Sequence, residues 1–381
     1  MKKFAFIFSV IVFIIYFITS AGKTPYDYFT RLSDSFLHGK IYLADNPPWL
    51  NELIPAGANK FYVVYPPMPA FLSIPFRFVW GEKFEQQYMA EILGAGIIFF
   101  TILISWSIKK DKILALWSGI LIGLGTIIWF MSSNGSVWYL SQISGAFFLT
   151  WAIYESLNKR RAFLVGIFLG CAYLSRIEIV LSIPLFLYFF WGKNWFKNYL
   201  MLGLGMIPFI LSDFLYNFVR FGVIWDKSYV LIPGVLNESW YQNGLFSLKN
   251  IPNHLTVIFA ALPIFTKDFP FIKPSWGGLA IWITTPAFIY SLFAKFKENV
   301  VKFSWVSIIL ISLLIFSHGT TGFTQFGYRF AVDFYPILMF LTIKGVARTG
   351  LKWHHWVLLI LSIVVNLWGV LWINKFGWVS F

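Results

Sequence analysis

A series of long apolar runs constrains the fold of this chain more than any other feature. A helix that crosses the roughly 30 Å hydrocarbon core of a bilayer needs about 20 mostly apolar residues. Eleven runs meet or approach this length: 4–21, 86–107, 113–131, 137–155, 162–175, 178–192, 199–219, 276–294, 302–317, 330–346 and 355–374. Only 12% of the 381 residues are charged, whereas a soluble chain carries about 25%. The sequence therefore predicts an all-α polytopic membrane protein with about eleven transmembrane helices.

Two further apolar runs are ambiguous, and the distribution of charge decides between the alternatives. The run 61–81 contains four prolines, and 253–266 is only half a span. If both remain outside, the N-terminus and the short inner loops hold more than half of the 30 lysines and arginines. The positive-inside rule favours that arrangement, with the N-terminus in the cytoplasm and the C-terminus outside. A single domain, 1–381, then has two large outer loops, 22–85 and 220–275.

The net charge of +14 would suggest a nucleic-acid partner in a soluble protein. In a membrane protein, loop lysines instead set the topology and contact anionic lipid headgroups. We therefore expect membrane lipids as partners, no nucleic acid, and a location in the cell membrane. The first apolar run is expected to act as an uncleaved signal anchor, because it is long and the remaining chain is also hydrophobic.

The segment 25–39, PYDYFTRLSDSFLHG, follows the first predicted span and has the pattern of an amphipathic helix. Spacings of i, i+4, i+7 and i+11 place its polar residues on one face: Asp27, Arg31, Asp34 and His38. Apolar residues occupy the other face: Phe29, Leu32 and Phe36. We expect an interfacial helix that lies on the outer leaflet with its apolar face toward lipid.

Asp27 is the first candidate catalytic residue, because it lies at the end of the first span on a helix whose position that span fixes. A half-buried carboxylate at the membrane surface can serve as general base for a hydroxyl whose co-substrate arrives from the lipid. Asp34, Arg31 and His38 on the same face are expected to support it. The alternative is a solvated carboxylate paired with Arg31 at i+4.

The segment 326–336, FGYRFAVDFYP, supplies a second candidate group, with Arg329 at the outer end of a span and Asp333 one turn deeper. Ionisable groups at this depth are costly, so a functional role is the first hypothesis. Arg329 is expected to bind a phosphate in bidentate fashion, oriented by Asp333, with Tyr328 in support. The alternative is a structural ion pair between Arg329 and Asp333 that joins two helices.

Three further residues are expected near this site. Arg176, in the turn LSRIEIV between two short spans, is a second phosphate candidate, unless it only pairs with Glu178. Tyr65 lies in VVYPPMPAF, a segment whose prolines make it stiff, and can donate a hydrogen bond. Gln142 follows the outer loop SSNGS and is expected to face the same pocket.

Several kinds of catalytic motif are absent from the sequence. There is no HExxH, CxxC, GxxxxGK[ST] or GxSxG pattern, and no DxD pair of the kind that chelates a metal with a nucleotide sugar. The five histidines have no metal-ligand spacing. We therefore expect no metal site and no cofactor. A divalent metal remains compatible with the sequence, although nothing in it indicates one.

These motifs resemble the GT-C glycosyltransferase superfamily, whose polytopic members take sugars from polyprenyl-phosphate carriers. The matching segments are YDYFTRLSDSFLHG, YPPMPAF, RRAFLVGIFLGCAYLSR, NFVRFG and FGYRFAVDFYP. Protein O-mannosyltransferases and lipid A aminoarabinose transferases are relatives of this type. The resemblance implies a sugar transferase that acts on the outer face with inversion. By the same resemblance Asp27 is the base, Arg329 or Arg176 holds the donor phosphate, and the acceptor hydroxyl belongs to a glycan, lipid or protein.

The sequence also departs from those relatives. Aminoarabinose transferases have Glu-Lys before the two prolines, where this chain has Val64 and Tyr65. The change removes one metal ligand and one phosphate-binding cation. Protein mannosyltransferases have Asp-Glu at the first motif, where Asp27 is followed by Tyr28. The resemblance is therefore to a superfamily and not to one activity.

Two other classes of protein remain open at this point. A multi-pass secondary transporter of a small polar or anionic solute would also place charges inside the membrane. Against it, the charges gather at the outer end and the two halves of the chain do not mirror each other. A non-catalytic scaffold for envelope assembly would tolerate the loss of Asp27.

Overall fold

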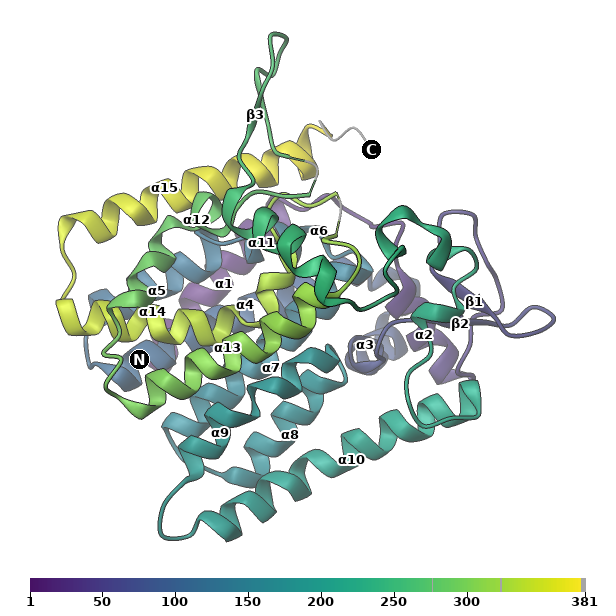
Figure 1. The fold of residues 1–381 in the computed structure, drawn as a ribbon, viewed down its shortest axis with the longest axis horizontal. Helices are drawn as coiled ribbons and strands as arrows, with labels where there is room; N and C mark the ends of the chain where they lie inside the picture. Colours follow the sequence, from purple (N-terminus) through teal and green to yellow (C-terminus); the bar gives the residue numbers. More distant parts are fainter. Residues whose placement is uncertain (276, 323, 378–381) are drawn as a thin grey trace.

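The computed structural model describes residues 1–275, 277–322 and 324–377, and it consists mainly of helices that run side by side (Figure 1). The α-helices are α1 (Lys2–Ile18), α2 (Tyr28–Leu37), α3 (Met68–Trp80), α4 (Gln86–Ile108), α5 (Lys112–Leu124), α6 (Ile128–Asn134), α7 (Val137–Leu157), α8 (Ala162–Tyr173), α9 (Ile183–Phe190), α10 (Trp195–Phe221), α11 (Ile251–Ala260), α12 (Ile281–Thr284), α13 (Asn299–Ser317), α14 (Tyr335–Thr349) and α15 (Trp353–Val370). Short 3-10 helices important for the site are η2 (Ile177–Ser182), η3 (Tyr229–Leu231), η7 (Pro286–Phe293) and η8 (Arg329–Asp333).

Two small antiparallel hairpins interrupt the helical architecture. One pairs β1 (Leu53–Pro55) with β2 (Phe61–Val63), and Ile54 lies opposite Tyr62 in its register. The other pairs β3 (Ile264–Phe265) with β4 (Ile272–Lys273) and projects from the bundle beyond α15 (Figure 1). Both hairpins belong to the loops predicted to lie outside the membrane. The rest of the described chain is mainly helical, as the sequence predicted.

The predicted number of spans, eleven, is not confirmed. In the described residues four helical segments are long and apolar enough to cross a membrane: Gln86–Ile108, Trp195–Phe221, Asn299–Ser317 and Trp353–Lys375. A fifth is possible if α5 and α6, which meet at a bend of 52°, form one broken span. The predicted run 178–192 divides into η2 and α9. The run 276–294 begins outside the described residues, and Pro286 separates its remainder into α12 and η7, because proline cannot continue the hydrogen-bond ladder.

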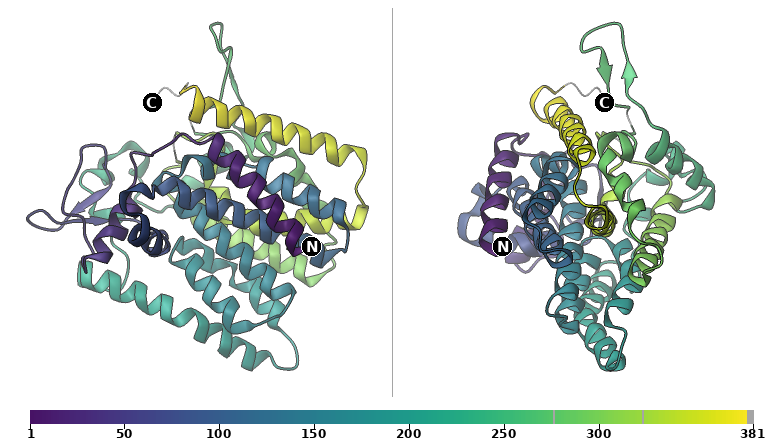
Figure 2. Two further views of the ribbon diagram at one scale, coloured as in Figure 1. Left: turned by 180° about the vertical axis from the view of Figure 1, so that it is seen from behind. Right: turned by 90° about the vertical axis from the view of Figure 1, so that its left-hand side faces the viewer.

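Helix α4 forms the centre of the bundle, and α10 and α15 lie at opposite edges of it (Figure 2). In the most apolar part of α4, 78% of the residues are buried, compared with 22% in α10. Glycines bring α10 against α8: a Cβ on Gly166 would lie 2.1 Å from the carbonyl oxygen of Leu202. Small residues at such crossings allow helix backbones to approach closely where lipid surrounds the helices.

The two ends of the bundle differ in character. The N-terminus and the α9–α10 and α14–α15 connections lie at one end, whereas α2 and the β1–β2 hairpin lie at the other, which is named the α2 end (Figure 1). The loops named here that the charge pattern assigned to opposite sides of a membrane therefore lie at opposite ends of the bundle, and which end is outside stays a prediction.

The amphipathic helix predicted in 25–39 is present as α2, but its apolar face is not directed toward lipid. Phe29 and Leu32 are completely buried, and the ring of Phe36 stacks on Phe71 of α3 at 4.8 Å. The predicted lipid contact is therefore wrong for this face, because α2 and α3 cover each other's apolar surfaces. The ambiguous run 61–81 explains this result, since it folds into β2 and α3 at the α2 end.

The predicted topology can be tested by cysteine labelling, because Cys171 is buried and should give little background. Asn237→Cys, in the exposed part of the loop between α10 and α11, should react with an impermeant thiol reagent added to intact cells. Asn158→Cys, exposed between α7 and α8, should react only after the membrane is opened. The reverse pattern would contradict the assignment of the α2 end to the outside.

Candidate active site

A buried ion pair joins two distant segments at the α2 end. Arg176, between α8 and η2, places its Nη2 atom 3.0 Å from Oδ2 of Asp333, which is completely buried at the end of η8. The same Nη2 atom lies 3.0 Å from Oε1 of Glu178. The pair between Arg176 and Glu178 that the sequence allowed is therefore present. The alternative ion pair between Arg329 and Asp333 does not form, since Asp333 bonds to Arg176. The expectation that Asp333 orients Arg329 is wrong for the same reason.

Arg329, at the start of η8, keeps a guanidinium group without a carboxylate partner. No ion pair joins it to any residue in the described ranges. Its Nη1 atom donates a long hydrogen bond of 3.4 Å to Oε1 of Gln142, whose Nε2 atom donates to the Arg329 carbonyl oxygen at 3.0 Å. The guanidinium also lies 4.7 Å from the ring centre of Phe330. Arg329 is thus fixed in place and still able to bind an anion.

Close backbone packing determines where Arg329 lies. The segment before it pairs with Leu279, because Leu279 donates to the carbonyl oxygen of Phe326 and accepts from the amide of Tyr328. Gly327 permits this approach, since a Cβ there would lie 2.7 Å from Ile127 and 2.9 Å from Thr284. A larger residue at this position would push the segment that carries Arg329 outward.

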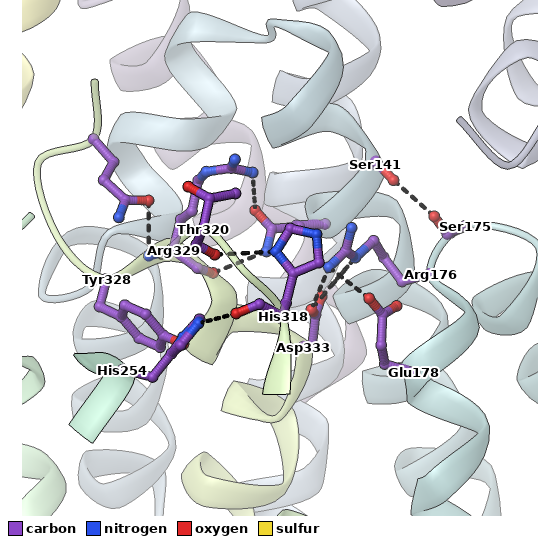
Figure 3. Close-up of polar contacts among 12 residues, drawn as sticks. Ser141, Ser175, Arg176, Glu178, His254, His318, Thr320, Tyr328, Arg329 and Asp333 are labelled. Atoms are coloured by element: carbon purple, nitrogen blue, oxygen red, sulfur yellow. Dashed lines mark hydrogen bonds and ion pairs between the residues drawn. The ribbon is translucent and has the colours of Figure 1, made fainter. Parts of the chain in front are cut away.

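Two histidines brace the same segment (Figure 3). Nε2 of His254 lies 2.9 Å from the carbonyl oxygen of His318, so this nitrogen carries the proton, because a carbonyl only accepts. Nδ1 of His254 then accepts from the hydroxyl of Tyr328 at 2.6 Å. His318 lies between Arg176 and Arg329 in Figure 3 and interacts electrostatically with both. Tyr328 is thus bonded to His254, and its predicted role in support of a phosphate ligand stays a prediction. No sequence pattern indicated these two histidines.

Glu52 is a site residue that the sequence reasoning missed. It precedes β1, and its Oε2 atom accepts a hydrogen bond of 2.9 Å from the indole of Trp138, at the start of α7. Its Oε1 atom lies 3.4 Å from the hydroxyl of Tyr229 in η3. A signal was available in the sequence, because Glu52 stands among Leu50, Leu53 and Ile54, and apolar neighbours of this kind draw a residue into the protein.

The electrostatic surroundings of Glu52 are those of a partly desolvated acid near a cation. Burial raises its pKa from 4.5 to about 7, and the hydrogen bond from Trp138 and the positive charge of Arg329 oppose this rise. Arg329 in turn interacts electrostatically with Glu52, Arg176, Tyr139 and Tyr229. The structure therefore gathers two arginines, Arg176 and Arg329, and three carboxylates, Asp333, Glu178 and Glu52, at the α2 end. Clusters of interacting charged groups are typical of functional sites.

Asp27 lies beside this group and not within it. Its Oδ1 atom accepts a bond of 2.7 Å from Nε of Arg31, as the i+4 spacing predicted, and Arg31 also binds Asp45 at 2.9 Å. The residues before and after Asp27 in the sequence contact Glu52 or its partner. Tyr26 packs on Trp138 with ring centres 4.7 Å apart, and the hydroxyl of Tyr28 accepts from the Glu52 amide at 3.1 Å. Asp27 and Glu52 thus share one side of the α2 end.

The remaining predicted residues lie apart from the arginines. Asp34 forms a bidentate ion pair with Arg77 of α3, which places it between helices as a structural residue. His38 is exposed, and its Nδ1 atom bonds to the carbonyl oxygen of Asp34 at 2.8 Å. Tyr65 is buried and packs edge-on against Tyr28 and Phe29, on the side of Asp27. It therefore lies near the predicted base and not beside the predicted phosphate ligands.

A small polar cavity of about 240 Å³ adjoins Asp27 through Arg31. Its polar lining consists of Arg31, Asp34, Ser35, His38, Lys40, Tyr42 and Asp45. In the described parts of the chain, His, Cys, Asp and Glu side chains form no group of three or more that could hold a metal ion.

The fold is similar to those of two solved structures. One is ArnT from Cupriavidus metallidurans bound to undecaprenyl phosphate, at 11% identity and a TM-score of 0.56, which covers 96% of this chain and 63% of that chain. The other is an oligosaccharyltransferase from Archaeoglobus fulgidus, at 12% identity and a TM-score of 0.55, which covers 98% of this chain and 55% of that chain. Both are GT-C enzymes, so the superfamily resemblance is confirmed for the fold.

The chain spans less than two thirds of the length of either of these proteins. No protein-family model and no curated protein matches the sequence. The similarity therefore concerns the fold, and the chemistry has to be argued from the residues of this chain.

The raised pKa of Glu52 predicts a pH-dependent stability. The unfolded chain loses this proton near pH 4.5 and the folded protein only near pH 7, so the stability contributed by the protonated acid is lost as the pH rises between these values. Glu52→Gln has no proton to lose at this position. The difference in melting temperature between Glu52→Gln and wild type should therefore be a few degrees more favourable to the variant at pH 8 than at pH 5. Thermal unfolding of the purified wild type and variant at pH 5 and pH 8 measures this difference in melting temperature. Glu82→Gln, an exposed acid after α3, serves as control, and an equal pH effect there would contradict the assignment.

Proposed function

We propose that the protein is a glycosyltransferase that moves a sugar from a polyprenyl-phosphate donor to an acceptor hydroxyl at the outer face of the membrane. The observation that carries this proposal is the guanidinium of Arg329, which has no carboxylate partner in the described chain and lies near Arg176. The fold supports it, because a protein of similar fold has been solved with undecaprenyl phosphate bound.

Arg329 is the main donor phosphate ligand in this proposal. Its planar group can bind two phosphate oxygens at once, and the bond that it would release, to Gln142, is long at 3.4 Å. Arg176 is already bonded to Asp333 and Glu178, so its charge is compensated and its main role is to hold these segments beside Arg329. Arg329 stabilises the negative charge that the phosphate gains as the sugar departs. For this reason we propose that the reaction needs no metal and no other cofactor.

Asp27 is the proposed base. Its carboxylate takes the proton from the acceptor hydroxyl while that oxygen bonds to the anomeric carbon and the bond from carbon to the phosphate oxygen breaks. The polyprenyl phosphate leaves with the electron pair of that bond, and the anomeric configuration inverts. Only Oδ1 of Asp27 is bonded to Arg31, and the side chain is 17% exposed, so a substrate hydroxyl can reach the carboxylate. The adjoining polar cavity offers a place for part of the acceptor, a glycan, lipid or protein.

The proposed arrangement in the membrane follows from the charge pattern and the shape. An N-terminus in the cytoplasm and about eleven crossings, some by broken or short helices, place the α2 end outside. The chain connections shared by each end of the bundle support this orientation (Figure 1). No structural observation favours the transporter alternative, and the similar folds are those of transferases.

The role of Asp27 can be tested by substitution. Asp27→Asn keeps the shape and removes the basicity, so turnover should fall about 10²–10⁴-fold, while binding of the donor changes little. Turnover is measured by transfer of radiolabelled sugar from polyprenyl-phosphate donors. Asp45→Asn is the matched control, because Asp45 also bonds to Arg31 but is 60% exposed. If Asp45→Asn is as damaging as Asp27→Asn, the loss comes from Arg31 or from the polar cavity that Asp45 lines, and not from removal of a base.

The role of Arg329 can be tested by binding alone. Arg329→Ala should weaken binding of undecaprenyl phosphate to the purified protein at least tenfold, and Arg329→Lys should weaken it less, because lysine keeps the charge but loses the planar group. Titration monitored by thermal shift measures both affinities. Arg348→Ala, an exposed arginine at the opposite end of the bundle, should leave affinity unchanged. Equal affinities for wild type and Arg329→Ala would exclude Arg329 as the phosphate ligand.

A further inference from the structure

The proposed mechanism assigns roles to Asp27 and the two arginines but none to Glu52. Glu52 is nevertheless close to Arg329, because Trp138, which donates to Glu52, and Gln142, which bonds to Arg329, lie one helical turn apart on α7. The two groups form no ion pair with each other within the described chain, so neither charge is neutralised by the other. A ligand bound beside both groups would meet a cation on one side and a carboxylate on the other.

The carboxylate of Glu52 is held so that it can accept additional hydrogen bonds. Trp138 donates to one oxygen at 2.9 Å and Tyr229 to the other at 3.4 Å. A carboxylate has about four acceptor positions, and side chains in the described part of the chain occupy one on each oxygen. The amide of Glu52 is bonded to the hydroxyl of Tyr28, which fixes the backbone as well. Glu52 is therefore rigid before any ligand binds.

The walls around Glu52 are aromatic. Trp138 packs against Tyr26 with ring centres 4.7 Å apart, and Tyr229 packs against Tyr241 at 6.3 Å. Tyr139, which lies near Arg329, uses its hydroxyl to donate to the carbonyl oxygen of Thr324 at 2.6 Å. Large rings of this kind offer apolar faces with polar tips. Rings that flank a fixed carboxylate suit a ligand that has both C–H faces and hydroxyl groups.

A sugar phosphate has an anionic group and hydroxyl groups next to each other. When the phosphate of a donor is bound by Arg329, hydroxyl groups of the attached sugar can reach Glu52, because Trp138 and Gln142 hold the two charged groups about one helical turn apart. We propose that Glu52 accepts hydrogen bonds from hydroxyl groups of the donor sugar, so that the site takes neutral or amino sugars and rejects acidic ones. This inference rests on the proposed function, because it assumes that Arg329 binds the donor phosphate.

The rejection of acidic sugars follows from charge. A uronic acid would bring a second carboxylate against Glu52 in a partly desolvated space, where repulsion between like charges is strong. A neutral sugar instead gives the buried carboxylate the hydrogen bonds that it lost with water, and bonds to a charged acceptor are stronger than bonds between neutral groups. The Glu52 carboxylate therefore distinguishes acidic sugars, which it repels, from neutral sugars, which donate hydrogen bonds to it.

The test compares a bare carrier with carriers that bear a sugar. Wild-type protein is titrated at pH 8 with undecaprenyl phosphate and with undecaprenyl phosphate linked to a neutral hexose, a neutral pentose, an amino sugar or a uronic acid. We expect at least one neutral or amino sugar to bind more tightly than the bare carrier, and the uronic acid to bind less tightly. Glu52→Gln should bind the bare carrier at least as tightly as wild type does, because it removes a negative charge near the phosphate ligand. Its preference for the sugar-bearing carrier over the bare carrier should fall about 10- to 100-fold.

Two variants control for indirect effects. Glu238→Gln removes an exposed acid that also interacts electrostatically with Glu52, and it should keep the wild-type preference for sugar. Glu52→Asp keeps the charge and should retain more of that preference than Glu52→Gln does. A melting curve at the pH of the titration shows whether each variant is folded.

The outcomes separate the inference from the proposed function. If wild-type protein binds neither the bare carrier nor any sugar-bearing carrier, the proposed function itself fails. If the bare carrier binds but no sugar improves binding, or if Glu52→Gln keeps the full preference, the inference about Glu52 fails and the function stands. If Glu52→Gln binds every carrier normally and loses turnover, Glu52 is the base, and the inference is again overturned.

Discussion

The ion pair between Arg176 and Asp333 is the interaction on which the rest of the α2 end depends. Asp333 is completely buried, and 157 residues separate it from Arg176 in the sequence. Removal of one partner from a buried pair costs about 3–5 kcal/mol, because the other charge is left uncompensated. The pair therefore holds the α8–η2 junction against η8. Because it uses the carboxylate that the sequence suggested for Arg329, it also leaves Arg329 free to bind an anion.

The segments that carry the candidate site are mostly breaks between helices. Arg176 lies between α8 and η2, Arg329 begins η8, and Glu52 precedes a short strand. Side chains and backbone contacts replace the missing helical bonds: Gln86 donates to the carbonyl oxygens of Tyr26 and Gly135 and accepts from the amide of Phe29. Irregular backbone of this kind is tolerated at membrane depth where protein surrounds it. The candidate site residues therefore lie mostly where helices end.

The similarity of fold at 11% and 12% identity shows how little of the sequence is needed to specify the architecture. Most residues therefore differ between chains that share this fold. The residues of the candidate site are more constrained than those that specify the fold, because the role of each one depends on particular neighbouring side chains. Val64 and Tyr65 stand where some GT-C enzymes have Glu-Lys, and Tyr65 here packs on aromatic rings near Asp27.

The sequence by itself determined the helical class, the amphipathic helix α2 and the local ion pairs Arg31–Asp27 and Arg176–Glu178, since periodicity and short spacings act within one or two turns of chain. Only the tertiary structure decided which partner Asp333 takes and where helices break. It also decided that the apolar face of α2 meets α3 and that Glu52 lies near Arg329. These features join residues far apart in the chain. Their energies depend on burial and on distances between side chains, which exist only once the helices have packed.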